Sequence, residues 1–382
     1  MRSSTRGQVD PFIVMDVMEA ARQAEDAGHH IIHMEVGQPS TPAPKAARRK
    51  LAQAMEAGPL GYTVALGLPE LRAGIADLYH RWYGVTLDPE RVVVTAGSSA
   101  AFVLAFTALF DAGARVGLST PGYPSYRQIL SALSLEPKLI PGEAAHGFQP
   151  QPGDVSGLDG LIVASPANPT GTMLDRGALG KLAYACSASD TALISDEIYH
   201  GIDYDTRAVS ALEVTDDVYV INSFSKYFSM TGWRIGWMVV PESHVRTVER
   251  LAQNMFICAP HASQIAALGA LEATEELEGH KAVYAANRRL LLDGLRAAGI
   301  PMISPADGAF YLYLDVSQWT EDSRVLARDI LETARVAVTP GLDFDAARGH
   351  QTLRLSYARA TADITEGLAR LSAYFAAADR IA

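Results

Sequence analysis

The sequence predicts an α/β protein with a mostly parallel sheet, covered by helices on both faces, and a smaller α+β domain. Short apolar runs alternate with helical patterns between residues 91 and 221, which is typical of parallel strands joined by crossover helices. Polar residues follow the ends of these runs. After residue 298 fewer strands occur, with helices between them, and this change indicates the second domain, which the N-terminal segment is expected to join.

Composition restricts the functional classes. The chain has 382 residues and a formal net charge of −11, and an acidic surface repels phosphate backbones. No segment reaches the roughly 18 apolar residues of a membrane span. Cys186 and Cys258 lack metal-ligand spacing and favour a reducing compartment. We expect a cytoplasmic protein that binds neither nucleic acid nor membrane.

The N-terminal third predicts helices over 12–27, 45–56 and up to residue 83, with a strand over 31–36. Three histidines, at positions 29, 30 and 33, surround that strand. Strand alternation places neighbours on opposite faces, and we see no acidic or cysteine partners flanking them, so no metal site is expected. Gly37 begins a turn that would bring backbone N–H groups close to a ligand.

The predicted sheet presents polar residues at one edge. A strand over 91–95, a Gly/Ser turn and a helix over 100–110 form an arrangement that binds anions at the helix N-terminus. Ligands collect at the C-terminal ends of parallel strands. The residues that follow strand ends are Ser98, Ser99, Tyr123, Asn168, Asp196, Tyr199 and Lys226.

The remaining elements are predicted from the same patterns. The long helical pattern over 260–298 is expected to break near Gly279. Further strands are predicted over 115–119, 160–165, 192–195, 218–221, 233–240, 309–314, 336–338 and 352–357, and further helices over 126–133, 175–187, 323–334 and 361–377.

Residues 223–237 hold the candidate for chemistry. Lys226 lies in a loop rich in serine, glycine and aromatic residues between two predicted strands. An ε-amine becomes nucleophilic at neutral pH if burial or a nearby cation lowers its pKa, and Arg234 can supply that cation. Ser223 and Arg234 can also bind an anion. Lysine, anion site and apolar surroundings together suggest a Schiff base to a phosphorylated aldehyde.

Three motifs occur in order: Asn168-Pro-Thr-Gly171, Asp196-Glu-Ile-Tyr199, and Ser223-x-Ser225-Lys226 followed by Arg234. In this order and spacing they resemble the class I and II aminotransferases, pyridoxal 5′-phosphate enzymes of fold type I related to aspartate aminotransferase. The resemblance extends from Gly37 to Arg354. It implies a seven-stranded sheet, with an N-terminal arm and part of the small domain in 1–44, a large domain over 45–275 and a small domain over 276–382.

The resemblance also assigns roles around the cofactor ring. Asp196 would hold the pyridine nitrogen protonated, so that the ring withdraws electrons from the substrate Cα. Asn168 and Tyr199 match residues that hydrogen-bond the phenolic oxygen of the cofactor and lower the pKa of the imine. Tyr123 takes the position of the aromatic side chain that stacks on the ring.

Phosphate binding is implied for Ser98, Ser99, Ser223 and Arg234. Tyr62 stands where a tyrosine of the second subunit reaches the phosphate in this family. The resemblance therefore implies a homodimer with shared active sites.

Substrate binding is implied for Arg354, which would pair with the α-carboxylate, and for Gly37 and Asn168. The expected reaction moves an amino group from an L-amino acid to a 2-oxo acid through a Lys226 Schiff base, with Lys226 transferring the proton from Cα. No residue is assigned to a side-chain carboxylate, so aspartate specificity is not supported. Aromatic, aliphatic and alanine-type donors stay open.

Two alternatives share most of these residues. A carbon–sulfur β-lyase of the same fold would need the same cofactor and the same lysine. A regulatory protein could use the fold to bind an effector, although the acidic chain speaks against a DNA-binding partner domain. Glu197 and His200 have the spacing of a metal-ligand pair, but a single pair predicts no site and His200 is interpreted as structural.

Overall fold

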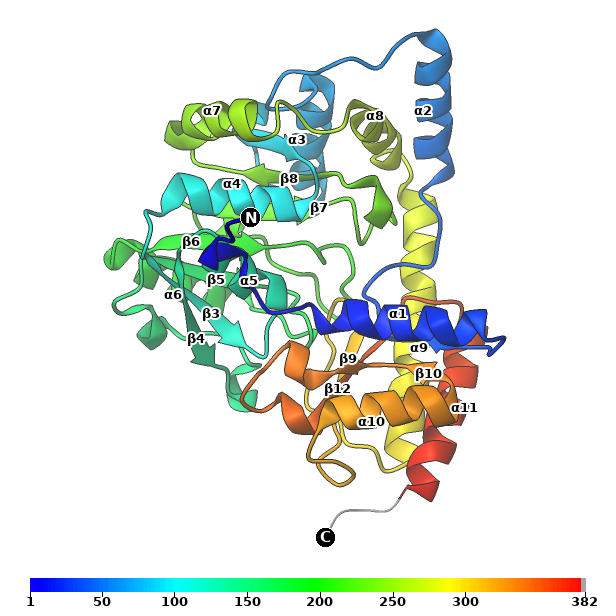
Figure 1. The fold of residues 1–382 in the computed structure, drawn as a ribbon. Coiled ribbons are helices and arrows are strands. Elements are labelled where there is room, and N and C mark those ends of the chain that lie inside the picture. Colours follow the sequence, from blue (N-terminus) through cyan, green and yellow to red (C-terminus); the bar gives the residue numbers. More distant parts are fainter. Residues whose placement is uncertain (379–382) are drawn as a thin grey trace.

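The computed structural model describes residues 1–378, and its centre is a seven-stranded sheet (Figure 1). The strand order is β2-β8-β7-β6-β5-β3-β4, and β8 alone runs antiparallel to its neighbours. The fold class predicted from the sequence is confirmed. The strands are β2 (Val92–Thr95), β3 (Arg115–Thr120), β4 (Glu136–Pro141), β5 (Gly160–Ala164), β6 (Ala192–Asp196), β7 (Tyr219–Ser223) and β8 (Gly236–Val239).

Helices cover both faces of this sheet because its inner strands are apolar on both faces. In β5, Ile162 packs in the core beneath α4 (Ser98–Leu109), α5 (Pro124–Ala132) and α7 (Val245–Met255). Its neighbours Leu161 and Val163 belong to the opposite core. The helices on that side are α3 (Pro69–Tyr83), α6 (Arg176–Ala188) and α8 (His261–Ala270). Two-sided burial explains why these strands are continuous apolar runs.

The sequence patterns did not predict β4. This strand forms one edge of the sheet, and its side chains are exposed or half-buried. Pro137 and Pro141 interrupt any apolar run, so the period-two signal is weak. The strand predicted over 233–240 is also shorter, since Thr231–Trp233 is a 3-10 helix. The sequence patterns also did not predict helix α7.

The predicted helix break at Gly279 is wrong. α8 ends at Ala270, and α9 runs from Thr274 to Ala297 with Gly279 inside it. Gly279 is exposed, where glycine costs a helix only about 1 kcal/mol. Glu275 and Glu276 in the first turn of α9 favour a helix start there through the helix dipole.

The second sheet region combines the two ends of the chain. β1 (Ile32–His33) pairs in parallel with β10 (Val336–Ala337), and β9 (Tyr311–Asp315), β11 (Thr339–Pro340) and β12 (Thr352–Ser356) form an antiparallel sheet. The predicted strand over 31–36 therefore shortens to two residues. The helices here are α1 (Ile13–Asp26), α9, α10 (Ser323–Asp329), a π-helix over Ile330–Ala334 and α11 (Thr361–Ala377).

Figure 1 shows α1 lying across the molecule between the large sheet and the α10–α11 region. α2 (Lys45–Ala57) packs closely against α8, where Gly269 approaches the backbone of Ala46. The boundaries 1–44, 45–275 and 276–382 stay a prediction. Across residues 1–378, no helix has the length and apolarity needed to cross a membrane.

Candidate active site

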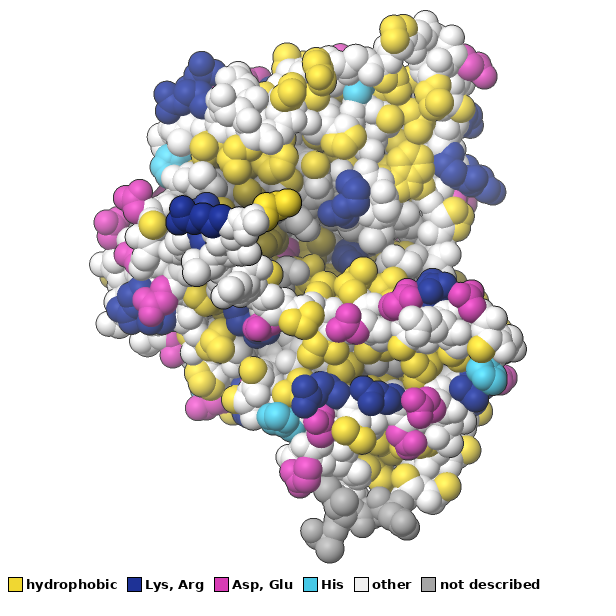
Figure 2. All heavy atoms as spheres, viewed as in Figure 1, with side chains coloured by type: hydrophobic (Ala, Val, Ile, Leu, Met, Phe, Trp, Pro, Cys, Tyr) yellow, Lys and Arg dark blue, Asp and Glu magenta, His cyan; other side chains and the backbone are white. Residues whose placement is uncertain are grey.

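A cavity of about 290 Å³ lies at the C-terminal edge of the large sheet. Figure 2 shows the molecule hollowed above α1. Of the residues predicted from the sequence, Ser223 and Tyr62 are absent from its walls, and the others all line it: Gly37, Ser98, Ser99, Tyr123, Asn168, Asp196, Tyr199, Lys226, Arg234 and Arg354.

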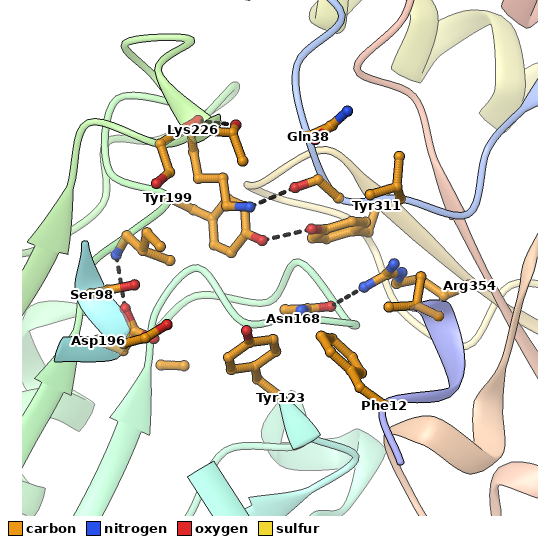
Figure 3. Close-up of a pocket in the computed structure, with 18 of the residues that line it drawn as sticks. Phe12, Gln38, Ser98, Tyr123, Asn168, Asp196, Tyr199, Lys226, Tyr311 and Arg354 are labelled. Carbon is orange, nitrogen blue, oxygen red and sulfur yellow. Dashed lines mark hydrogen bonds between the residues drawn. The ribbon is translucent and has the colours of Figure 1, made fainter. Parts of the chain in front are cut away.

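Lys226 follows β7 and extends into the cavity (Figure 3). Its Nζ donates a hydrogen bond to the carbonyl oxygen of Gly37 at 2.5 Å. Burial and the positive charges of Arg354 and Arg234 lower the pKa of this amine to about 7, while Asp196 opposes the shift. A large fraction of the amine is therefore neutral, and so nucleophilic, near pH 7.

Asp196 ends β6 and is 4% exposed. Its carboxylate accepts hydrogen bonds from the hydroxyl of Tyr126 and from the backbone N–H of Ile198 at 3.0 Å. Burial raises the pKa of this carboxyl to about 6, and these hydrogen bonds and the charge of Lys226 limit the rise. A buried carboxylate with neutral hydrogen-bond donors suits a cationic ligand atom such as a protonated ring nitrogen.

The anion-binding end combines a helix N-terminus with Arg234. Ser98 and Ser99 begin α4. Arg234 has a left-handed backbone with φ of 51°, and its guanidinium passes so close to Gly97 that a Cβ there would lie 2.4 Å from Nη2. Gly97 thus leaves the space in which the cation meets the helix end. This donor set fits a phosphate group.

Ser223 supports this end from behind. Its side chain is buried and accepts a hydrogen bond from the backbone N–H of Ser225 at 3.0 Å. Ser225 and Thr231 line the cavity instead. The hydroxyl that the sequence places at 223 therefore holds the loop, and the neighbouring hydroxyls face the cavity.

Aromatic side chains surround the middle of the cavity. Tyr123 makes edge contacts with Phe12 and Tyr126, with ring centroids 5.9 and 5.2 Å apart. The hydroxyl oxygens of Tyr199 and Tyr311 are 2.6 Å apart (Figure 3). A larger residue at Gly37 would displace the Tyr311 ring, because a Cβ would lie 1.9 Å from the Tyr311 hydroxyl.

Arg354, on β12, forms the opposite end. Its Nη1 donates to Asn168 Oδ1 at 2.9 Å and its Nη2 to the Glu35 carbonyl oxygen. The guanidinium lies over the rings of Tyr311 and Phe344, 4.3 and 4.7 Å from their centroids. The Nε–H is buried and has no hydrogen-bond partner within residues 1–378. A carboxylate ligand would satisfy this donor.

Sequence reasoning missed several lining residues. Tyr126 was interpreted only as the start of a helix, and Tyr311 only as part of a strand. The residues 12–18 were predicted to be helical without a role in the site. An apolar face at spacing 14, 15 and 18 is a general helix signal, so nothing local in the sequence marks it as a cavity wall. The additional apolar lining side chains include Phe12, Val14, Met15, Met18, Val36 and Ile198.

The expectation that the histidines at positions 29, 30 and 33 have no acidic partners is wrong for His33. His33 does have acidic neighbours, since Nδ1 lies 2.9 Å from Glu35 Oε1 and Nε2 lies 3.0 Å from Glu25 Oε1. Within the described residues, no group of three or more His, Cys, Asp or Glu side chains could hold a metal ion.

The Glu197 and His200 pair is embedded in the core. Glu197 accepts hydrogen bonds from the hydroxyl of Ser210 and the backbone N–H of Ala211. His200 contacts the hydroxyl of Tyr83 through Nδ1 and the Ser165 carbonyl oxygen through Nε2. These partners satisfy both side chains, in agreement with the structural interpretation of His200.

Comparison with known proteins identifies the family. Residues 29–371 match the family model for aminotransferases of class I and II. The chain therefore belongs to the class I and II aminotransferases, which use pyridoxal phosphate. It is 47% identical to the valine–pyruvate aminotransferase of Mycobacterium tuberculosis, over 98% of both chains.

Two solved structures share the fold over nearly the whole chain. A putative aminotransferase from Silicibacter pomeroyi has 63% identity and a TM-score of 0.94, covering 99% of this chain and 100% of its own. Aspartate aminotransferase from Thermus thermophilus with maleate has 31% identity and a TM-score of 0.91, covering 98% of this chain and 100% of its own. The chain thus has the aspartate aminotransferase fold and is an aminotransferase.

Proposed function

We propose that this aminotransferase moves the amino group of a neutral, apolar L-amino acid to a small 2-oxo acid. When bound, pyridoxal phosphate withdraws electrons from the substrate Cα and makes its proton acidic. The chain's own residues bind the cofactor, orient the substrate and move the proton. Their assignment below is part of the same proposal.

Lys226 is the proposed base and acid. Its pKa of about 7 lets the same amine accept a proton and return it near neutral pH. It also holds the cofactor covalently between turnovers. Asp196 is proposed to pair with the ring nitrogen, and Tyr199 and Asn168 with the phenolic oxygen.

Ser98, Ser99 and Arg234 are proposed to bind the phosphate, with Ser223 holding the loop that carries Lys226 and Tyr123 stacking on the ring. Arg354 is proposed to bind the α-carboxylate through its unpaired Nε–H and a neighbouring N–H group. Gly37 keeps the space between these groups open.

The apolar side chains of α1 that line the cavity support the proposed donor class. Phe12, Met15 and Met18 lie along the cavity. The basic side chains among the described lining residues are Lys226, Arg234 and Arg354, and each already has a role above. A substrate side-chain carboxylate would therefore meet apolar groups and remain unpaired, which costs binding energy.

The similarity to the valine–pyruvate aminotransferase of M. tuberculosis supports the same donor class. A spectroscopic substrate screen tests it. Purified holoenzyme is mixed with alanine, valine, leucine, phenylalanine or aspartate, and the absorbance of the bound cofactor is followed, before pyruvate or 2-oxoglutarate is added. Apolar donors should change the spectrum and a 2-oxo acid should restore it. A preference for aspartate over valine would contradict the proposal.

We also propose a homodimer with shared active sites in a reducing compartment such as the cytoplasm. Tyr62 is 82% exposed and Val64 is 59% exposed, so this loop is available to a second copy. Free Cys186 and Cys258 support the compartment. Sedimentation analysis tests the dimer. Mixing Lys226→Ala and Tyr62→Ala subunits should restore part of the activity if each site uses both chains.

A further inference from the structure

The first turn of α1 is held by a carboxylate from the far end of the chain. Asp343 Oδ1 accepts a hydrogen bond from the N–H of Ile13 at 3.1 Å, and Oδ2 accepts one from Val14 at 3.2 Å. Phe12 occupies the N-cap position and makes no side-chain hydrogen bond there. Since the first N–H groups of a helix have no partner within it, Asp343 supplies the cap that Phe12 cannot.

The two halves of α1 are fixed by different contacts. In the second half, Ala21 packs in a small core with Ile31 and Leu331. The first half instead carries Met15 and Met18 along the cavity. Residues 1–11, which precede the helix, are exposed, and their side-chain contact to the large domain is the pair of hydrogen bonds between Asp10 and Gln128. The position of the apolar wall therefore depends on the cap together with this contact and the packing of Phe12 on Tyr123.

The same short segment also reaches the carboxylate-binding end. Asp343 ends the turn Gly341–Asp343, and the ring of the next residue, Phe344, lies 4.7 Å from the Arg354 guanidinium. One turn thus contacts both the helix that forms the wall and the cation proposed for the α-carboxylate. The segment fixes the distance between these two parts of the substrate site.

We propose that Asp343 is a positioning residue that sets the preference for larger apolar side chains by holding the first turn of α1 against the cavity. The inference rests on the proposed function, because it requires an apolar substrate side chain at this wall. Valine can use the wall, whereas the methyl group of alanine is too short. Loss of a helix cap should weaken valine binding about tenfold.

The test compares donor selectivity in the holoenzyme. Asp343→Ala removes both hydrogen bonds, and Asp343→Asn keeps one amide oxygen. Asp175→Ala is the matched control, because Asp175 Oδ1 caps α6 through the N–H of Ala178 at 2.7 Å and does not line the cavity. The change in cofactor absorbance gives the apparent Kd and the rate at saturation for alanine and for valine.

The ratio of the valine Kd to the alanine Kd should rise about tenfold in Asp343→Ala, by less in Asp343→Asn, and not in Asp175→Ala. The rates at saturation should stay within about twofold of the wild type, since Asp343 lies outside the proposed catalytic groups. An unchanged ratio in the Asp343 variants would overturn the inference. An equal rise in the apparent Kd for alanine and for valine would also overturn it, because the effect would then act through Arg354.

Hydrogen exchange separates this inference from the proposed function. Amides 13–18 should exchange faster in Asp343→Ala than in wild type or Asp175→Ala. Unchanged exchange would refute the capping role even if catalysis changed. If exchange is faster in Asp343→Ala but the wild type does not react with valine, the capping role stands. The proposed donor class is then contradicted and, with it, the role of Asp343 in selectivity. Asp343→Asn preserves the side-chain shape and provides the same readouts if Asp343→Ala does not fold.

Discussion

The two ends of the cavity are built in different ways. The polar end is formed by residues at or just after the ends of strands of the large sheet, such as Asp196 and Lys226. The opposite end is assembled from segments far apart in the chain, namely α1, β9 and β12. Sheet topology brings the first group together, whereas the second depends on tertiary packing. Chemistry common to the family is therefore proposed for the first end, and substrate preference for the second.

The largest expected effect is at the polar end. Lys226→Ala should reduce kcat by at least about 10³-fold, because the proton-transfer group and the covalent attachment are both lost. Initial rates with valine and pyruvate measure this. Mass spectrometry after borohydride treatment should find cofactor bound to wild type and not to the variant. A residual rate above one tenth of wild type would remove Lys226 from the proposed mechanism.

At the opposite end, Arg354→Lys should lower kcat/KM by about 10²-fold for every amino acid, since an ammonium cannot reproduce the planar donors of a guanidinium. Alanine and valine should suffer equally. This uniform loss would distinguish Arg354 from the wall residues, whose changes should depend on side-chain size. A loss limited to valine would contradict its assignment to the α-carboxylate.

Asp196→Asn should have opposite effects on the free protein and on the loaded enzyme. The folded pKa of about 6, against an ordinary value of 3.8, means that the folded state binds more protons between these pH values, so stability falls as pH rises through them. The difference corresponds to about 3 kcal/mol. Cofactor-free Asp196→Asn should therefore be more stable than cofactor-free wild type above pH 6, while its activity falls.

Urea unfolding of both cofactor-free proteins at pH 4 and pH 8 measures this effect. The stability difference between them should be small at pH 4 and approach about 3 kcal/mol at pH 8. If the wild type is the more stable protein at pH 8, the buried carboxylate does not destabilise the cofactor-free protein.

The smallest effect is expected where the two ends meet. Tyr311→Phe removes the hydroxyl 2.6 Å from that of Tyr199 and should lower kcat/KM about three- to tenfold, the usual size of one neutral hydrogen bond. Tyr199→Phe serves as the comparison and should cost more, because Tyr199 is proposed to contact the cofactor directly. Equal losses would place Tyr311 in direct contact as well.

The success of the sequence-based predictions differs between the same two ends of the cavity. Asp196, Asn168 and Lys226 were predicted to meet because parallel strands end at one edge, and the structure places them around one cavity. The half-exposed strand β4 was not predicted, because Pro137 and Pro141 interrupt the apolar run. The role of Asp343 was not predicted, because its hydrogen bonds to α1 join positions more than 300 residues apart, for which the local pattern contains no signal.

The edges of the large sheet also determine how molecules meet in concentrated solution. At one edge, the Leu66 carbonyl oxygen accepts the N–H of Val94 in β2, so part of that strand is already paired. At the other edge, Pro137 and Pro141 in β4 have no N–H to donate, and Lys138 adds charge. A strand from another molecule would find few bonding partners at either edge. Intermolecular sheet extension, a common start of aggregation, is thereby discouraged.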